Sequence, residues 1–152
     1  MNYDQKGINS APKMIIFGDS MKMNPVVHFE MPAEDRTRMR KFYETAFGWK
    51  TNQLGKEMGE YVLVTTTDTD ENRMVTKPGT INGGFYQRTD DPVSHAPSVV
   101  IQVDDINESI KKVEKAGGKI NGKPMEIPGV GWFCSLIDTE GNRVSMMQPL
   151  KK

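Results

Sequence analysis

The chain has 152 residues, and its 20 Lys and Arg side chains balance 20 Asp and Glu side chains, so its formal net charge at pH 7 is zero. Without an excess of positive charge, neither nucleic acid nor a membrane surface is expected as a partner. The single cysteine, Cys134, excludes an intrachain disulfide and a cysteine-rich zinc site, and favours a cytoplasmic location. The longest apolar run near the start, residues 14–17, is too short for a signal-peptide core or a membrane span.

Residues 1–23 contain Gly, Ser, Asn and Pro without a sustained period, which predicts a flexible N-terminal arm. The rest, residues 24–150, is long enough to form one domain with its own core. Met21 is a candidate alternative start. Whether residues 1–20 belong to the native protein is therefore left open.

Residues 26–31 alternate between apolar and mixed positions, which predicts a half-buried strand that ends at Pro32. A helix is predicted after Asp35, a cap residue, because apolar side chains recur at helical spacing until Gly48. Three more strands are expected at about residues 49–54, 60–66 and 80–88. The first half, residues 26–88, therefore has the order βαβββ.

A linker over residues 89–97 separates this half from a second one over residues 98–149. The second half contains a strand at 98–103, a helix from Asp105 to the Gly117-Gly118 pair, and strands at 119–125, 131–137 and 142–148. The caps of the two predicted helices are 70 residues apart. This repeat indicates an α+β fold of two tandem βαβββ modules that form a curved mixed sheet around a central cleft.

Several short motifs resemble those of a known family. They are His28-Phe29-Glu30-Met31-Pro32, Phe47-Gly48-Trp49, Val103-Asp104-Asp105, Ile127-Pro128-Gly129-Val130-Gly131 and Asp138-Thr139-Glu140-Gly141-Asn142. Together they resemble the vicinal oxygen chelate superfamily, which contains glyoxalase I, bleomycin-resistance proteins and extradiol dioxygenases. The resemblance covers about residues 26–149. It implies a pocket for a small organic molecule and, as in many members, a homodimer.

Enzymes of this superfamily typically hold one divalent metal with four side chains, one from the first and one from the last strand of each module. By this resemblance His28 occupies one such position, whereas Ser98 and Ser145 occupy positions where a histidine and a carboxylate are expected. The fourth position is left open among Val75, Tyr86 and Gln87. Because a catalytic divalent ion usually needs about three protein ligands, no metal cofactor is expected, and His28 is a metal ligand only if a metal is present.

Polar and large side chains on the predicted cleft face are the candidate ligand-binding residues. They are His28, Glu30, Tyr86, Ser98, Gln102, Trp132, Ser145 and Met147. His28 and Glu30 share one strand face and are weak candidates for a catalytic base. Their alternative roles are a structural histidine and a solvated glutamate. The polar side chains at 98, 102 and 145 either bind a ligand or fill a wet cavity.

Three functions follow from these expectations. The leading one is a glyoxalase/bleomycin resistance/dioxygenase-like protein that binds a small organic molecule in the cleft without a metal. An alternative is a metal-dependent lyase, isomerase or dioxygenase that uses His28 and Glu30. Another is a non-catalytic dimerisation or interaction domain. These residues are compatible with an enzyme and with a binding protein.

Overall fold

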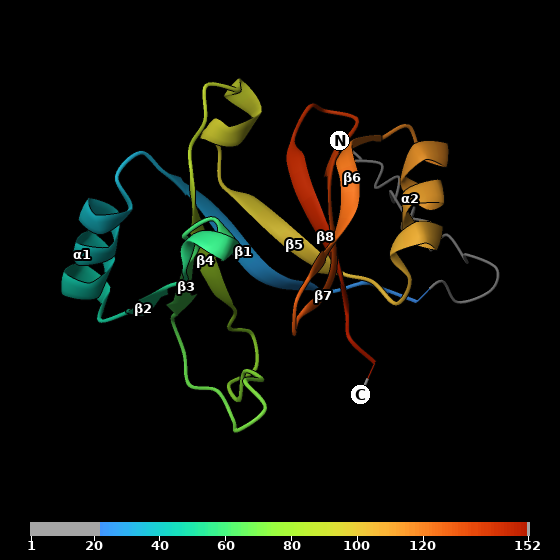
Figure 1. Ribbon diagram of the computed structural model, residues 1–152. Helices are drawn as coiled ribbons and strands as arrows, with labels where there is room; N and C mark the ends of the chain where they lie inside the picture. Colours follow the sequence, from blue (N-terminus) through green and yellow to red (C-terminus); the bar gives the residue numbers. More distant parts are fainter. Residues whose placement is uncertain (1–21, 152) are drawn as a thin grey trace, which may run out of the picture.

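A computed structural model describes residues 22–151 of the chain (Figure 1). The first module consists of β1 (Val26–Ala33), α1 (Arg36–Phe47), β2 (Lys50–Gln53), the 3-10 turn η1 (Lys56–Met58), β3 (Val62–Thr65) and β4 (Asn82–Gln87). The 3-10 turn η2 (Pro92–His95) follows, and then β5 (Ser98–Gln102), α2 (Ile106–Lys115), β6 (Lys119–Ile127), β7 (Gly131–Ile137) and β8 (Arg143–Pro149). The predicted arm lies outside the described residues except for its last two. Of these, Lys22 forms an ion pair with Asp104, 2.7 Å between Nζ and Oδ2.

The eight strands form one mixed sheet in the order β2-β3-β4-β1-β5-β8-β7-β6. Within each module the first and last strands are parallel neighbours, β1 with β4 and β5 with β8. The modules join where β1 runs antiparallel to β5 at the centre of the sheet (Figure 1). The predicted tandem βαβββ fold is confirmed.

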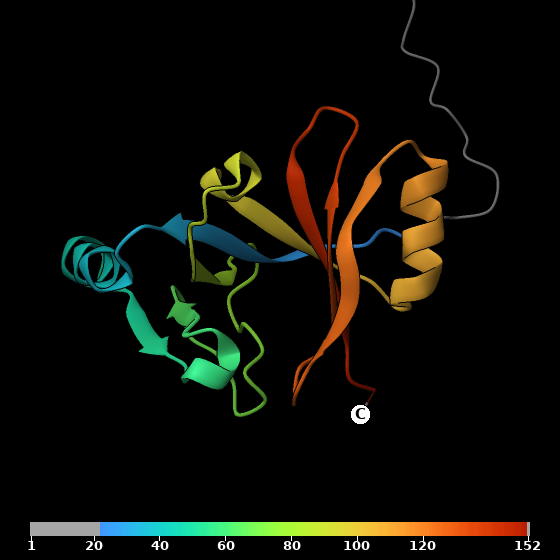
Figure 2. The same cartoon turned by 45° about the horizontal axis from the view of Figure 1, so that its top comes forward.

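The two helices begin in the same way. Asp35 accepts a hydrogen bond from the backbone N–H of Arg38, and Asp105 accepts one from Glu108, each at 2.9 Å. These bonds satisfy amide groups that have no partner inside the helix. Helix α1 ends at Gly48, whose φ of 68° is left-handed and suits glycine. Figure 2 shows the helices at opposite ends of the sheet.

Each helix packs on the sheet over its own core. The core of the first module is rich in aromatic side chains: Phe85 is fully buried, and Phe29, Tyr43 and Trp49 pack around it and its neighbours. The second core is mainly aliphatic and comprises Val103, Ile106, Cys134, Leu136 and Met146. Because side chains alternate along a strand, the remaining positions point to the opposite side. We refer to the helix-bearing side as the outer face and to the opposite side as the inner face.

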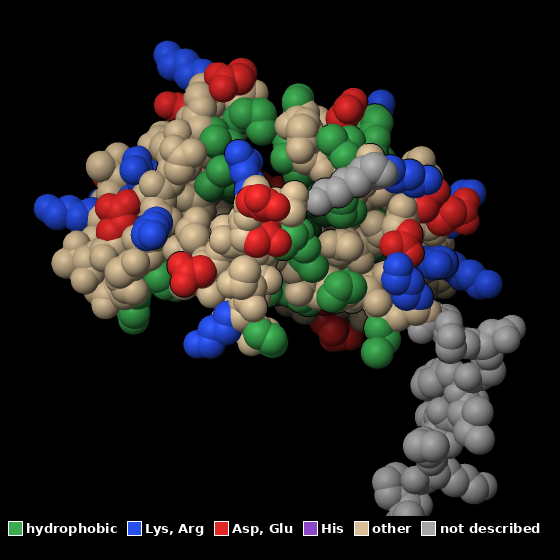
Figure 3. All heavy atoms as spheres, turned by 90° about the horizontal axis from the view of Figure 1, so that it is seen from below, with side chains coloured by type: hydrophobic (Ala, Val, Ile, Leu, Met, Phe, Trp, Pro, Cys, Tyr) green, Lys and Arg blue, Asp and Glu red, His purple; other side chains and the backbone are tan. Residues whose placement is uncertain are grey.

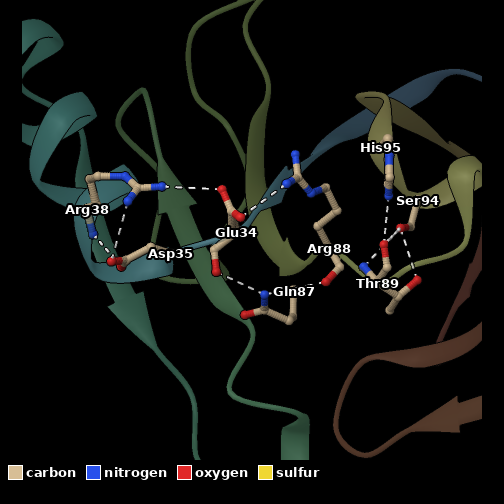
Figure 4. Close-up of polar contacts among 8 residues, drawn as sticks. All are labelled: Glu34, Asp35, Arg38, Gln87, Arg88, Thr89, Ser94 and His95. Atoms are coloured by element: carbon tan, nitrogen blue, oxygen red, sulfur yellow. Dashed lines mark hydrogen bonds and ion pairs between the residues drawn. The ribbon is translucent and has the colours of Figure 1, made fainter.

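The end of β4 and the segment after it are tied to the end of β1 (Figure 4). The Gln87 side chain donates to the Glu34 carbonyl oxygen at 3.0 Å, and Arg88 forms an ion pair with the Glu34 carboxylate at 3.4 Å. Further along, His95 Nε2 lies 2.7 Å from the Thr89 carbonyl oxygen. The segment between the modules therefore folds back on itself beside β1.

Acidic and basic side chains are interspersed on the surface. On the face shown in Figure 3, neither sign of charge gathers into one dominant patch. This distribution agrees with the formal net charge of zero. Across residues 22–151, no helix has the length and apolar character that a membrane crossing requires.

Candidate functional site

Polar side chains meet on the inner face where the two modules join. His28 and Glu30 come from β1, and Arg143 and Ser145 come from β8. Tyr61, which precedes β3, reaches the same place. We call these five residues the junction cluster.

Glu30 is the buried acid of the junction cluster, with only 7% of its surface exposed. Ser145 Oγ donates to Glu30 Oε2 at 3.4 Å, and Arg143 Nη1 lies 3.8 Å from the same oxygen. Burial raises the pKa of Glu30, because the charged carboxylate loses its hydration. The Arg143 charge and the Ser145 hydrogen bond act in the opposite direction without cancelling this effect.

His28 and Tyr61 form a hydrogen-bonded pair, with 3.0 Å between Nε2 and the phenol oxygen. Burial lowers the pKa of His28 to about 4, so the imidazole is neutral at neutral pH. Burial and the neighbouring Glu30 carboxylate raise the pKa of Tyr61, so the phenol keeps its proton. The pair is therefore uncharged and offers both a donor and an acceptor.

Tyr61 is positioned by its own loop and by a glycine on β4. Arg36 donates to the Gly59 carbonyl oxygen at 2.8 Å and pairs with Glu60 at 3.2 Å. Glu60 has a left-handed φ of 54°, uncommon for a residue other than glycine. A Cβ at Gly84 would overlap the Tyr61 ring, so only glycine leaves room for the ring there. The tyrosine thus occupies the space beside β4 that a side chain at 84 would fill.

Arg143 is held by an aromatic ring. Its guanidinium carbon lies 4.5 Å from the ring centroid of Tyr86, a cation–π distance. The Tyr86 hydroxyl lies 3.0 Å and 2.9 Å from the carbonyl oxygens of Ser94 and Ala96. Burial raises the pKa of Tyr86. The Nε and Nη2 atoms of Arg143 are buried and have no hydrogen-bond partner within the described part of the chain.

Residues 26–67 match the family described as bleomycin resistance protein-like, N-terminal. A glyoxylase-like domain-containing protein from Didymella fabae is 31% identical to the chain over 116 residues, which are 74% of this chain and 84% of that relative. The chain belongs to this glyoxalase and bleomycin-resistance family, within the vicinal oxygen chelate superfamily. The predicted resemblance is confirmed.

Solved structures of methylmalonyl-CoA epimerases share the fold. One is 13% identical, with a TM-score of 0.62, and the match covers 87% of this chain and all of that one. A Streptomyces coelicolor epimerase variant in complex with 2-nitronate-propionyl-CoA is 12% identical, with a TM-score of 0.61 and coverage of 86% of this chain and 100% of that one. At these identities the likeness concerns the fold alone.

The sheet register identifies the position that the sequence left open in the superfamily's chelating set. Glu30 pairs with Gly84 in the first module, and Val100, 70 residues after Glu30, pairs with Ser145 in the second. Gly84 is therefore the counterpart of Ser145. The fourth position is therefore this glycine and not one of the expected candidates, Val75, Tyr86 and Gln87. The register in which β4 pairs with β1 differs from the one that those candidates require.

With this register, the positions that correspond by resemblance to the superfamily's chelating set are His28, Gly84, Ser98 and Ser145. One imidazole and two hydroxyl groups, with no carboxylate, do not match the donors that divalent ions prefer. The Ser98 hydroxyl is already engaged, because it donates to the Arg143 carbonyl oxygen at 2.9 Å. Among residues 22–151, no three His, Cys, Asp or Glu side chains are grouped so that they could hold a metal ion. The residues present do not fit the superfamily's metal.

The structure brings most of the predicted site residues together. His28, Glu30 and Ser145 contact other members of the junction cluster directly, and Tyr86 and Ser98 contact Arg143. The remaining predicted inner-face residues are Gln102 and Met147. They pair with each other two residues further along β5 and β8 than the Val100–Ser145 pair.

The placement of Trp132 with these residues is wrong. Side chains alternate along β7, so Trp132 lies on the same side of the strand as Cys134 and Leu136, which belong to the second core. Ser135 lies on the opposite side. Trp132 lies instead by Ile106 and Gln148 on the outer face. Strand character was predicted correctly, and only the direction of the side chain was not.

Tyr61 and Arg143 were missing from the predicted site. Arg143 lies two residues before Ser145 on the same strand, so alternation alone places both on one face. Tyr61 gave no comparable signal, because its place depends on the absence of a side chain at Gly84. That relation appears only when β3 and β4 are paired.

Two hollows lie on the outer face, away from the junction cluster. The larger, about 430 Å³, lies between α2 and the sheet and is lined by residues that include Lys112, Val113 and Met146. The smaller, about 310 Å³, lies beside Trp132 at the start of α2. The larger is lined mainly by residues of the second core and the smaller by residues of α2, β6, β7 and β8, and neither lining contains a residue of the junction cluster.

Proposed function

We propose that this family member binds a small organic molecule at the junction cluster and does so without a divalent metal. The observation that carries the proposal is the composition of the chelating positions. His28 is the only strong metal donor among them, and the place of the fourth side chain is filled by Tyr61. A hydrogen-bonding surface thus replaces a metal-binding one.

The cluster offers a ligand three kinds of polar group. The His28–Tyr61 pair is uncharged and can donate and accept hydrogen bonds. Arg143 supplies a buried positive charge. Glu30, with its raised pKa, is the group suited to accept a proton from a bound molecule. Binding and proton transfer by Glu30 are both compatible with this arrangement.

The relatives support a small organic ligand. The Didymella fabae relative is named for a glyoxylase-like domain, and the structural neighbours include epimerases in complex with CoA derivatives. These names support the class of ligand for this chain and not its identity.

Thermal-shift titrations with nickel, manganese, iron(II) and zinc test the metal-independent part. A metal that binds a preformed site of the fold raises its melting temperature with concentration. We expect no saturable shift with any of the four ions. A saturable shift that disappears in a His28→Gln variant would instead support the metal-dependent lyase, isomerase or dioxygenase.

Native mass spectrometry tests the ligand-binding part. We expect the freshly purified protein, or the protein mixed with a library of small organic molecules, to carry an added mass that Tyr61→Ala and Glu30→Ala variants do not retain. Adducts that persist in both variants would place binding elsewhere. The homodimer expected from the family resemblance stays a prediction, which light scattering tests.

A further inference from the structure

One edge of the Arg143 guanidinium is buried without a partner. The two atoms concerned, Nε and Nη2, lie along one edge of the planar guanidinium, and neither has a hydrogen-bond partner in residues 22–151. The third nitrogen, Nη1, faces Glu30 at 3.8 Å. A buried, charged donor without an acceptor is costly, so an unmatched pair of them on one edge calls for a physical explanation.

The geometry of this edge suits an anion with two acceptor oxygens, of which a carboxylate is the smallest organic example. A planar carboxylate accepts two parallel hydrogen bonds from two N–H groups on one guanidinium edge. A ligand with a single acceptor oxygen would leave one of the two N–H groups unmatched. The Tyr86 ring, 4.5 Å from the guanidinium carbon, supports the plane. The two N–H groups of this edge are thus oriented to donate two parallel hydrogen bonds.

We propose that the small molecule bound at the junction cluster carries a carboxylate, and that this carboxylate binds to Nε and Nη2 of Arg143. This inference rests on the proposed function, since it names the chemical class of the ligand at the same site. It also gives Glu30 a second role. The Glu30 carboxylate competes for the same positive charge, so it weakens the binding of a second anion.

The ligand must displace neighbouring side chains to reach this edge. Both unmatched nitrogens are out of contact with solvent, although 14% of the Arg143 side chain is exposed. Tyr86, which stacks on the guanidinium, is attached through its hydroxyl to the carbonyl oxygens of Ser94 and Ala96. These two carbonyl oxygens belong to the segment between the modules, which therefore holds the Tyr86 ring in place over the guanidinium.

Nuclear magnetic resonance of the ¹⁵N-labelled full chain tests the proposal with the simplest carboxylate. The Nε–H signal of Arg143 is assigned from its loss in an Arg143→Lys variant. The wild-type protein is then titrated with sodium acetate at constant ionic strength, maintained with sodium chloride. Acetamide, which has the same shape and no charge, is the matched neutral probe. We expect a saturable shift of the Arg143 Nε–H signal with acetate and none with acetamide.

Two variants sharpen the result. Arg143→Lys keeps the charge but loses the two parallel N–H groups, so acetate binding measured on the Ser98 and Ser145 amides should weaken about tenfold or more. Glu30→Gln removes the competing charge and should tighten acetate binding several-fold. A purely structural Arg143 would give no saturable acetate shift in any of the three proteins.

The outcomes separate this inference from the proposed function. If acetate leaves Arg143 unaffected while acetamide or another neutral molecule shifts inner-face amides, the carboxylate is excluded and the site remains. If acetate and acetamide act equally, the carboxylate is excluded as well. If small-molecule screening shifts no inner-face signal at all, both the inference and the proposed function are overturned.

Discussion

The two modules of this chain agree where they build the fold and differ where they face the site. Both begin their helices with an aspartate cap at 2.9 Å, and both pair their first and last strands in parallel. Their inner faces differ: the first contributes His28 and Glu30, and the second contributes Arg143 and Ser145. The backbone fold of the two modules is thus symmetric. The different side chains on its two halves make one asymmetric site.

The largest expected effect concerns the aromatic core of the first module. Phe85 is fully buried between α1 and the sheet, so Phe85→Ala should lower the free energy of unfolding by about 3–5 kcal/mol. The matched control is Phe42→Ala, because Phe42 is 57% exposed on α1 and should change stability by only about 0.5 kcal/mol. Urea denaturation measures both. Equal effects would mean that α1 does not pack as described.

The next effect depends on pH and is specific to the first module, because the second module has Ser98 at the position that corresponds to His28. The pKa of His28 falls from 6.5 in the unfolded chain to about 4 in the fold, so folding favours the neutral imidazole. The contribution of the neutral, buried His28 to the free energy of unfolding is fully present above about pH 6.5 and is lost as the pH falls through 4. Its limit is about 3 kcal/mol. Denaturation from pH 7 to 4 should therefore show a smaller loss of stability in His28→Gln. Parallel curves for the two proteins would contradict the burial of His28.

A smaller effect is expected at Gly84, the counterpart of Ser145. Gly84→Ala should cost about 1–3 kcal/mol, because the added methyl group overlaps the Tyr61 ring. In a Tyr61→Ala background the same change should cost much less, since the overlapping ring is gone. Equal costs in the two backgrounds would show that Tyr61 does not lie over Gly84. Thermal or urea denaturation of the four proteins completes the cycle.

The smallest effects test the symmetry of the backbone fold. Asp35→Ala and Asp105→Ala should each cost about 1 kcal/mol, because each removes one cap hydrogen bond of the same length. Asn substitutions, which keep a side-chain acceptor, should restore most of each loss. A cost at one cap only would mean that the two modules do not share this feature energetically.

The sequence was sufficient for the fold because the fold depends on local signals. Asp35 and Gly48 mark the ends of α1 through their own hydrogen bonds and backbone angles, and the 70-residue repeat transfers the aspartate cap to Asp105 at the start of α2. His28 and Glu30 were placed on one face by alternation alone. These predictions needed no knowledge of which strands are neighbours.

The rest of the site depends on strand pairing, which local patterns do not determine. The fourth chelating position was identified only when β4 paired with β1 and brought Gly84 opposite Glu30. Trp132 was misplaced because an aromatic residue in a strand suits either face. The orientation of Arg143 likewise depends on Tyr86, which comes from the other module.

Elemental analysis of the untagged native protein, purified without chelators or added metals, tests the central claim most directly. The claim is that the asymmetric inner face replaces a metal site with a hydrogen-bonding one. We predict no divalent metal in stoichiometric amount, in the wild-type protein as in His28→Gln. A stoichiometric ion in the wild-type protein that is lost in His28→Gln would contradict the account.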